Sequence, residues 1–206
     1  MLKLFGHPVS IHSRKAHFAL AELGQEHTYQ LVDLLKGEHH SPQFRAVNPS
    51  GKVPVLQDGD LQLPESGAIL RYLGENYGGG KLLPADKHQR ARVDQWLFWQ
   101  ASEAGPVLIK PFYQRLMERI QGKAHDEATF QQAVQGCDAP LKHLDEALAG
   151  KQFLVGDSLT IADIAIVESI FQLQMAGVGV SKFDNIQRWF NGIAERPAFQ
   201  KTRPPA

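Results

Sequence analysis

Residues 48–69, which read NPSGKVPVLQDGDLQLPESGAI, decide the interpretation of the fold. Two short apolar runs, Pro54–Gln57 and Leu61–Leu63, flank Asp58-Gly59-Asp60, and this combination predicts an antiparallel hairpin. The next segment, Glu65–Tyr77, has an apolar face at helical spacing, formed by Ile69, Leu70 and Leu73. The stretch therefore predicts a strand, a turn, a strand and a helix, in that order.

The residues before this stretch predict a βαβ unit. Leu2–Phe5 is a short apolar run, Ile11–Leu23 has apolar residues at helical spacing, and His27–Val32 is typical of a second strand. A loop or short helix is expected over Lys36–Val47. The first part of the chain thus predicts the order β-α-β-(loop/α)-β-β-α, in which a parallel βαβ unit precedes the antiparallel hairpin.

Strand signals disappear after the glycine-rich segment Gly78–Lys81, which is the best linker candidate in the chain. Beyond it the pattern predicts a long helix over His88–Gln121 with a break or kink at Gly105-Pro106. The apolar stripe over Phe130–Leu148 is interrupted by Pro140, which predicts either a kink there or two helices. Further helices are expected over Thr160–Met175 and Asn185–Glu195. We expect an α/β domain at residues 1–78, a linker at 79–88 and an all-helical bundle at 89–206.

The composition is ordinary for a soluble globular protein, with 43% hydrophobic and 21% charged residues. Lys+Arg and Asp+Glu each number 22, so no net charge favours nucleic acid or an anionic membrane. The N-terminus lacks the apolar core of a signal peptide, and no apolar run approaches the roughly 18 residues that span a bilayer. A single cysteine, Cys137, in an apolar helical stripe suits a buried packing role. We expect a cytoplasmic protein without nucleic-acid or membrane partners.

The segment between the first strand and the first helix places hydroxyl groups at a helix N-terminus. Ser10 can cap this helix by accepting a backbone N–H. It can also face a cleft and donate a hydrogen bond to a bound anion, which a helix N-terminus attracts. These residues alone leave both interpretations open.

Two further segments contain candidate ligand contacts. Pro54 begins a strand, and a cis Val53–Pro54 bond would present the backbone N–H and C=O of Val53 to a ligand. Ser66 can cap its own helix. Together with Glu65, however, it can also hold the carboxylate and the ammonium of an amino-acid head group.

In this order and at these spacings, the segments resemble the glutathione transferase superfamily, and most closely its serine-type phi and theta classes. The matching motifs are Gly37–His40, Asn48–Leu56, Leu63–Ile69 and, in the helical half, Val155–Asp163. The resemblance runs essentially end to end. It implies an N-terminal thioredoxin-like domain followed by a C-terminal helical bundle.

The resemblance implies a role for each candidate residue. Ser10 corresponds to the serine that hydrogen-bonds the glutathione sulfur, and Arg14, four residues on, supports that alignment over Ser13. Val53 would pair its backbone with the cysteinyl part of glutathione. Whether Ser13 substitutes for Ser10 is left open.

The remaining contacts that the resemblance implies lie at the two ends of glutathione. Glu65 and Ser66 would hold the γ-glutamyl head group. His39 and His40 would face the glycyl carboxylate, and Lys52 adds a positive charge where many phi members carry glutamine. No metal site is expected, because neighbouring histidines on a loop rarely complete one unaided.

The implied activity is that of a glutathione transferase involved in detoxification. Glutathione would bind as co-substrate, and its thiolate would react with a small apolar electrophile, with reduction of organic hydroperoxides as a second activity. The resemblance also implies a homodimer. Two alternatives stay open: a glutathione-dependent disulfide reductase, and a non-catalytic binding protein of the same fold.

One further motif in the helical half is structural. Thr160-Ile161-Ala162-Asp163 predicts a capping box, in which Thr160 caps the helix and Asp163 reaches back to the backbone N–H of Thr160.

Overall fold

The computed structural model of the chain describes residues 1–122 and 126–204. Its internal contacts group into two units, of which one comprises Met1–Ala85 together with the residues from Glu195 on, and the other Asp86–Ala194. The strands found in the described ranges all lie in the first unit, and the second is helical. No helix within these ranges combines the length and apolarity needed to cross a membrane.

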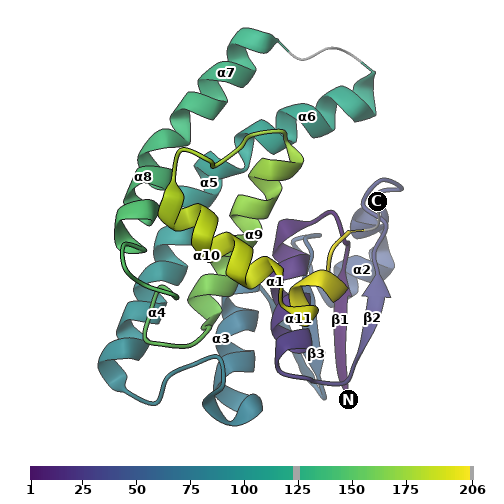
Figure 1. Cartoon of the computed structure of the whole chain (residues 1–206). Coiled ribbons are helices and arrows are strands. Elements are labelled where there is room, and N and C mark those ends of the chain that lie inside the picture. Colours follow the sequence, from purple (N-terminus) through teal and green to yellow (C-terminus); the bar gives the residue numbers. More distant parts are fainter. Residues whose placement is uncertain (123–125, 205–206) are drawn as a thin grey trace. The chain divides into compact units, whose positions relative to one another are not determined.

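The first unit is built on a four-stranded mixed sheet in the order β2-β1-β3-β4 (Figure 1). Its strands are β1 (Leu2–Gly6), β2 (His27–Leu31), β3 (Val55–Asp58) and β4 (Leu61–Pro64). β1 pairs with β2 in parallel, whereas β3 is antiparallel to both β1 and β4. The parallel βαβ unit and the antiparallel hairpin expected from the sequence are therefore confirmed.

The two faces of this sheet carry different sets of apolar side chains. Phe5 and Val55 are register partners and pack with Phe44 and Val32 in one cluster. Leu4 pairs with Leu56, and both are fully buried. Because successive side chains on a strand point to opposite faces, this second pair lies on the other face of the sheet.

Short helices complete the first unit: α1 (Ile11–Glu22), η1 (Glu38–His40), α2 (Pro42–Val47), α3 (Ser66–Asn76), η2 (Gly78–Gly80) and α11 (Pro197–Lys201). α1 packs against both α3 and α11. The rings of Phe18 on α1 and Phe199 on α11 meet edge to face, with centroids 5.4 Å apart. This contact explains why the residues from Glu195 on group with the first unit.

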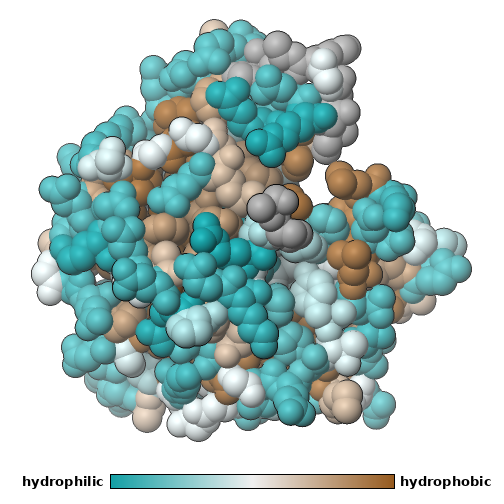
Figure 2. Space-filling model, turned by 45° about the vertical axis from the view of Figure 1, so that its right-hand side comes forward, coloured by the Kyte–Doolittle hydropathy of each residue, from teal (hydrophilic) through white to brown (hydrophobic). Residues whose placement is uncertain are grey.

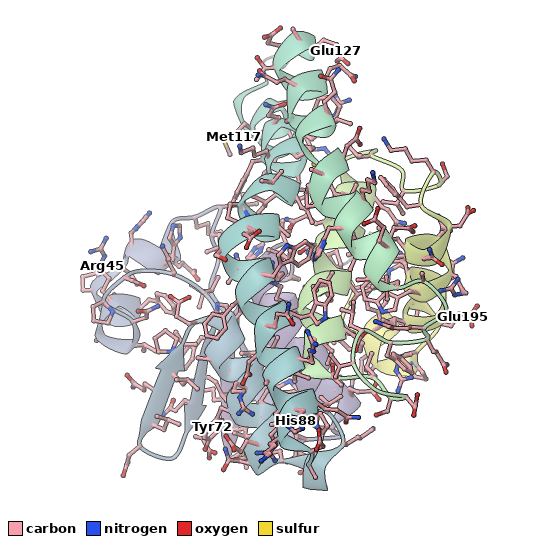
Figure 3. All side chains as sticks on the ribbon, turned by 90° about the vertical axis from the view of Figure 1, so that its left-hand side faces the viewer. Arg45, Tyr72, His88, Met117, Glu127 and Glu195 are labelled. Atoms are coloured by element: carbon pink, nitrogen blue, oxygen red, sulfur yellow. The ribbon has the colours of Figure 1, made fainter. Side chains whose placement is uncertain are left out.

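The end of β3 is joined to α3 by hydrogen bonds. Tyr72, which Figure 3 labels, donates its hydroxyl to Asp58 at 2.8 Å. Tyr77 donates to the same carboxylate. These two bonds hold the carboxylate ionised, and they lower the pKa of Asp58 below its usual value.

The second unit consists of helices α4 (Lys87–Trp99), η3 (Gln100–Ala104), α5 (Gly105–Leu108), α6 (Lys110–Gln121), α7 (Glu127–Gly136), α8 (Asp138–Ala147), α9 (Ile161–Met175) and α10 (Asp184–Ala194). α9 packs against α4, α5, α6 and α10, and its residues are buried from Ile161 through Leu173. A helix that is buried on every side forms the core of its bundle. In Figure 3 the labels Met117 and Glu127 locate α6 and the first residue of α7.

The helix predicted over His88–Gln121 is divided more finely than expected. A π-helical segment, η3, precedes Gly105, whose N–H bonds to the carbonyl of Gln100. Pro106 has no N–H, and its ring crowds the carbonyl four residues back, so the regular bonding pattern cannot continue. Gly105 is needed there because a Cβ would lie 2.5 Å from the Gln100 carbonyl oxygen.

Of the two alternatives expected around Pro140, a kink or two helices, the structure has two helices, and their junction precedes the proline. α7 ends at Gly136, and α8 begins at Asp138, so Cys137 separates the two helices. Pro140 falls in the first turn of α8, where a missing N–H costs nothing because those donors have no partner within the helix. Cys137 is fully buried, as predicted.

The surface that Figure 2 presents is mainly hydrophilic, with apolar residues in separate groups. Leu31 and Leu35, at the end of β2 and in the loop after it, are among the large apolar side chains that stay exposed. Isolated apolar side chains of this kind are ordinary on protein surfaces.

Candidate active site

Ser10 lies at the N-terminus of α1 and forms its N-cap. Its backbone is extended, and its hydroxyl oxygen accepts a hydrogen bond from the N–H of Ser13 at 3.4 Å. Accepting this bond uses a lone pair of the oxygen and leaves the hydroxyl proton for another partner. The two interpretations of Ser10 are therefore compatible, since one hydroxyl can cap the helix and still donate to an anion.

Ser13 has a different environment. It has no exposed surface, and its hydroxyl accepts from the backbone N–H of His7 at 3.2 Å. Gly6 makes room for it, because a Cβ at Gly6 would lie 3.0 Å from the Ser13 Cβ and 2.8 Å from the Tyr29 hydroxyl. Ser13 is thus enclosed by protein atoms, whereas Ser10 is only half-buried.

Arg14 braces the segment that carries Ser10. Its Nη1 donates to the carbonyl oxygens of Pro8 at 3.3 Å and Val9 at 3.1 Å. The residue is only 2% exposed. The guanidinium therefore fixes the two residues that precede Ser10 from inside the protein.

The turn before β3 is held by the side chain of Asn48. Its Nδ2 donates to the carbonyl of Lys52 at 2.7 Å, and its Oδ1 accepts from the N–H and the hydroxyl of Ser50 at 3.2 and 3.0 Å. The Val53–Pro54 peptide bond that follows is cis. Asn48 is not among the site residues expected from the sequence, although an Asn at the start of a Pro-Ser-Gly turn is a local signal for such bonds.

His39 and His40 lie next to this turn, in η1. Their rings are in contact, with centroids 3.8 Å apart and planes tilted by 43°. A Cβ at Gly51 would lie 2.9 Å from the His39 carbonyl oxygen, so the two segments are in close contact. Desolvation, and then the charges of His40 and Arg45, lower the pKa of His39. Figure 3 labels Arg45 on the adjoining α2.

Glu65 is the N-cap of α3 and has an uncommon backbone conformation. Its φ is 69° and its ψ is 110°, and its side chain makes no capping bond. A non-glycine residue held at such a positive φ costs about 1–3 kcal/mol, and such residues concentrate at functional sites. The expected self-capping by Ser66 is not found, because Ser66 is already inside the helix.

The hydroxyl of Ser66 instead meets a side chain from α1. The Nδ1 of His12 lies 3.1 Å from Ser66 Oγ, across 54 residues of sequence. His12 is not among the glutathione contacts that the sequence implies. No local signal reveals the contact, because it depends on how α1 packs against α3.

His12 lies among positive charges. It keeps solvent-exposed surface, but surrounding protein atoms desolvate the ring. This desolvation, and then the charges of Lys15, Lys52 and Arg14, lower its pKa to about 3. The imidazole is therefore neutral near pH 7, and the positive charges around it favour a bound anion.

The comparisons with known proteins agree with this geometry. Residues 4–81 match the family model for the glutathione S-transferase N-terminal domain, and residues 101–197 match that for its C-terminal domain. The chain belongs to the glutathione S-transferase family. The superfamily that the sequence motifs indicated is thereby confirmed.

Several individual relatives are similar over almost the whole chain. Glutathione S-transferase 3 of Zea mays is 34% identical over 206 residues, which cover 98% of this chain and 92% of that protein. The crystal structure of glutathione transferase F7 from Populus trichocarpa superposes with a TM-score of 0.90 at 28% identity, covering 98% and 97% of the two chains. The structure of glutathione S-transferase-I bound with lactoylglutathione gives 0.88, also at 28% identity, with the same coverages. The expected thioredoxin-like domain followed by a helical domain is therefore confirmed.

Proposed function

We propose that the chain is a cytoplasmic, homodimeric glutathione S-transferase that binds glutathione in the first unit and stabilises its thiolate with Ser10. The resemblance to relatives named glutathione S-transferase supports glutathione as the co-substrate. The observation that carries the assignment to Ser10 is its geometry. Its hydroxyl caps α1 through a lone pair and keeps its proton, at a helix end that favours negative charge.

The chemical requirement is ionisation of the thiol. A free thiol has a pKa of about 8.5 and is mostly protonated at neutral pH. Lowering that pKa by roughly two units corresponds to about 2.7 kcal/mol of preferential stabilisation of the thiolate. One hydroxyl donor and the partial positive charge of a helix N-terminus both contribute in this direction. The thiolate then attacks a small apolar electrophile, in a detoxifying conjugation.

The other predicted contacts complete the proposal. Val53, next to the Asn48-held turn, pairs its backbone with the cysteinyl part of glutathione. Glu65 and Ser66 hold the γ-glutamyl head group. The strained backbone of Glu65 supports this role, because such strain concentrates at functional sites. His39, His40 and Lys52 supply the polar and positive groups that favour the glycyl carboxylate.

The decisive experiment measures the ultraviolet thiolate absorbance of enzyme-bound glutathione against pH. We expect a thiol pKa well below that of free glutathione in the wild type, and a rise of one to two units in Ser10→Ala. Ser13→Ala is the matched control, and its thiol pKa should equal that of the wild type because Ser13 is enclosed. A pKa that does not change in Ser10→Ala would overturn the role of Ser10. Absence of glutathione binding would overturn the proposed function itself.

A further inference from the structure

The contact between His12 and Ser66 has chemical consequences for ligand binding. Ser66 is the first residue of α3 and is only 8% exposed, and its Oγ lies 3.1 Å from His12 Nδ1. His12 is the second residue of α1. The two helix N-termini thus meet through these two side chains.

The His12 ring is neutral near pH 7, because desolvation and the nearby Lys15, Lys52 and Arg14 lower its pKa to about 3. A neutral imidazole carries its proton on one ring nitrogen only, so Nδ1 either donates to Ser66 or accepts from it. The choice determines what Ser66 can offer a ligand. A serine hydroxyl has one proton and two lone pairs.

If Nδ1 accepted, Ser66 would spend its single proton on His12 and could present only lone pairs to a ligand, which a carboxylate cannot use. If Nδ1–H donates, it occupies a lone pair of Ser66 and leaves the hydroxyl proton for an anion. The cations around His12 favour an anion at this place. Only the second arrangement offers an anion both the nearby positive charges and a hydrogen-bond donor.

We propose that His12 is a positioning residue that donates from Nδ1–H to Ser66 Oγ, so that the Ser66 hydroxyl proton points at the α-carboxylate of the γ-glutamyl group. The inference rests on the proposed function, which places the γ-glutamyl head group at Glu65 and Ser66. It adds that His12 sets how strongly the site selects for this carboxylate. His12 itself touches Ser66, not the reacting sulfur.

A matched set of variants separates the effect of the hydrogen-bond donor at residue 12 from the effect of side-chain shape. His12→Asn keeps an amide N–H near the position of Nδ1, whereas His12→Leu has nearly the same shape as asparagine and no donor. Ser66→Ala removes the hydroxyl that His12 positions. All three are compared with the wild type after their circular dichroism spectra and unfolding midpoints have been checked.

The experiment measures the dissociation constants of two ligands by titration calorimetry. One is S-methylglutathione, and the other is its analogue without the α-carboxylate of the γ-glutamyl group. We expect loss of the carboxylate to weaken binding about 10- to 100-fold in the wild type, the size typical of hydrogen bonds to charged groups. In His12→Leu and Ser66→Ala, loss of the carboxylate should weaken binding by less than about 5-fold. In His12→Asn it should weaken binding about as much as in the wild type.

Each outcome bears on one claim. If the wild type does not bind S-methylglutathione, the proposed function fails, and this inference fails with it. If the wild type binds and His12→Leu retains the full carboxylate effect, the positioning role alone is overturned. If His12→Asn behaves as His12→Leu does, the donor role is overturned.

A second measurement uses only the wild-type protein, so its result does not depend on the stability of any variant. In wild-type protein with bound S-methylglutathione, the nitrogen-15 chemical shifts of the His12 ring identify which nitrogen carries the proton. A protonated Nδ1 supports the proposal, and protonation at Nε2 alone contradicts it.

Discussion

The carboxylate of Asp163 on α9 accepts a hydrogen bond from the indole Nε1–H of Trp189 on α10 at 2.9 Å. The same carboxylate accepts from the backbone N–H of Leu154 at 2.9 Å, and from the N–H and hydroxyl of Thr160 at 3.0 Å each. The capping box expected from the sequence is confirmed. Asp163 therefore does more than cap α9, because it also joins α10 and the loop at Leu154 to this helix. Burial raises the pKa of the Asp163 carboxyl, and the four donors oppose this rise.

Replacing Asp163 by alanine should lower the free energy of unfolding by about 3 kcal/mol or more. The change leaves buried donors of Leu154, Thr160 and Trp189 without an acceptor, and each such group costs about 1–3 kcal/mol. Urea unfolding measures the effect. Trp189→Phe is the partial control, since it removes one donor and leaves the other bonds of Asp163 in place. A loss of 1 kcal/mol or less in Asp163→Ala would mean that this carboxylate is only a helix cap.

Arg14→Met should impair catalysis more than binding. The variant keeps an apolar stem inside the protein but loses the bonds from Nη1 to the carbonyls of Pro8 and Val9. The segment that carries Ser10 then loses its brace, and we expect the thiol pKa of bound glutathione to rise and kcat to fall about tenfold. Pre-steady-state rates and the thiolate absorbance measure both quantities. Arg14→Lys keeps a buried donor, so its thiol pKa and its kcat should lie between those of Arg14→Met and the wild type. An unchanged thiol pKa in Arg14→Met would show that Ser10 is positioned without this brace.

Gly6→Ala should destabilise the protein by about 1–3 kcal/mol, because the added Cβ lies 2.8 Å from the Tyr29 hydroxyl and 3.0 Å from Ser13 Cβ. Gly192→Ala on α10 is the matched control, since its Cβ would meet no heavy atom within 4 Å. That control should stabilise the protein by about 0.5–1 kcal/mol through helix propensity alone. Thermal unfolding of the two variants separates these effects. Equal unfolding midpoints for the two variants would show that β1 accommodates the extra methyl group without loss of stability.

Local patterns in the sequence were sufficient to predict the elements of the first unit. The Asp58-Gly59-Asp60 turn and the apolar runs around it indicated the hairpin, and the spacing over Ile11–Leu23 indicated α1. Pro140 indicated that the stripe could divide into two helices, but it did not give the place of the junction, because a proline is tolerated in the first turn of a helix.

The contacts that shape the candidate site were less accessible to sequence reasoning. Motif spacing indicated Ser10, Glu65 and Ser66, because each lies where a strand leads into a helix. The contact of His12 with Ser66 depends on the packing of α1 against α3, for which neither helix carries a local signal. Sequence patterns report the period of one element, and they do not report which side chains of two distant elements meet.

An ion pair lies at the C-terminal end of α1. The carboxylate of Glu22 is joined to Arg196 by two bonds, from Nη2 at 2.5 Å and from Nε at 3.0 Å. Lys81 Nζ lies 3.3 Å from the same carboxylate. Burial acts to raise the pKa of Glu22, but the bonds and charges of Arg196 and then Lys81 outweigh it, so the pKa lies below its usual value.

The sign of the pH dependence follows from this lowered pKa. An acid whose pKa is lower in the folded state stabilises that state fully above its unfolded pKa of about 4.3, and the contribution disappears as the pH falls through the folded value. We expect Glu22→Gln to lower the free energy of unfolding by about 1–3 kcal/mol at pH 7, since Arg196 is partly exposed and solvent screens the pair. Urea unfolding at pH 7 and below pH 4 should show the difference from the wild type shrinking in acid. Lys36→Gln, which removes the exposed partner of Asp33, is the control and should change stability by less than about 0.5 kcal/mol. A Glu22→Gln difference that is the same at both pH values would mean that packing around residue 22, and not its charge, stabilises this end of α1.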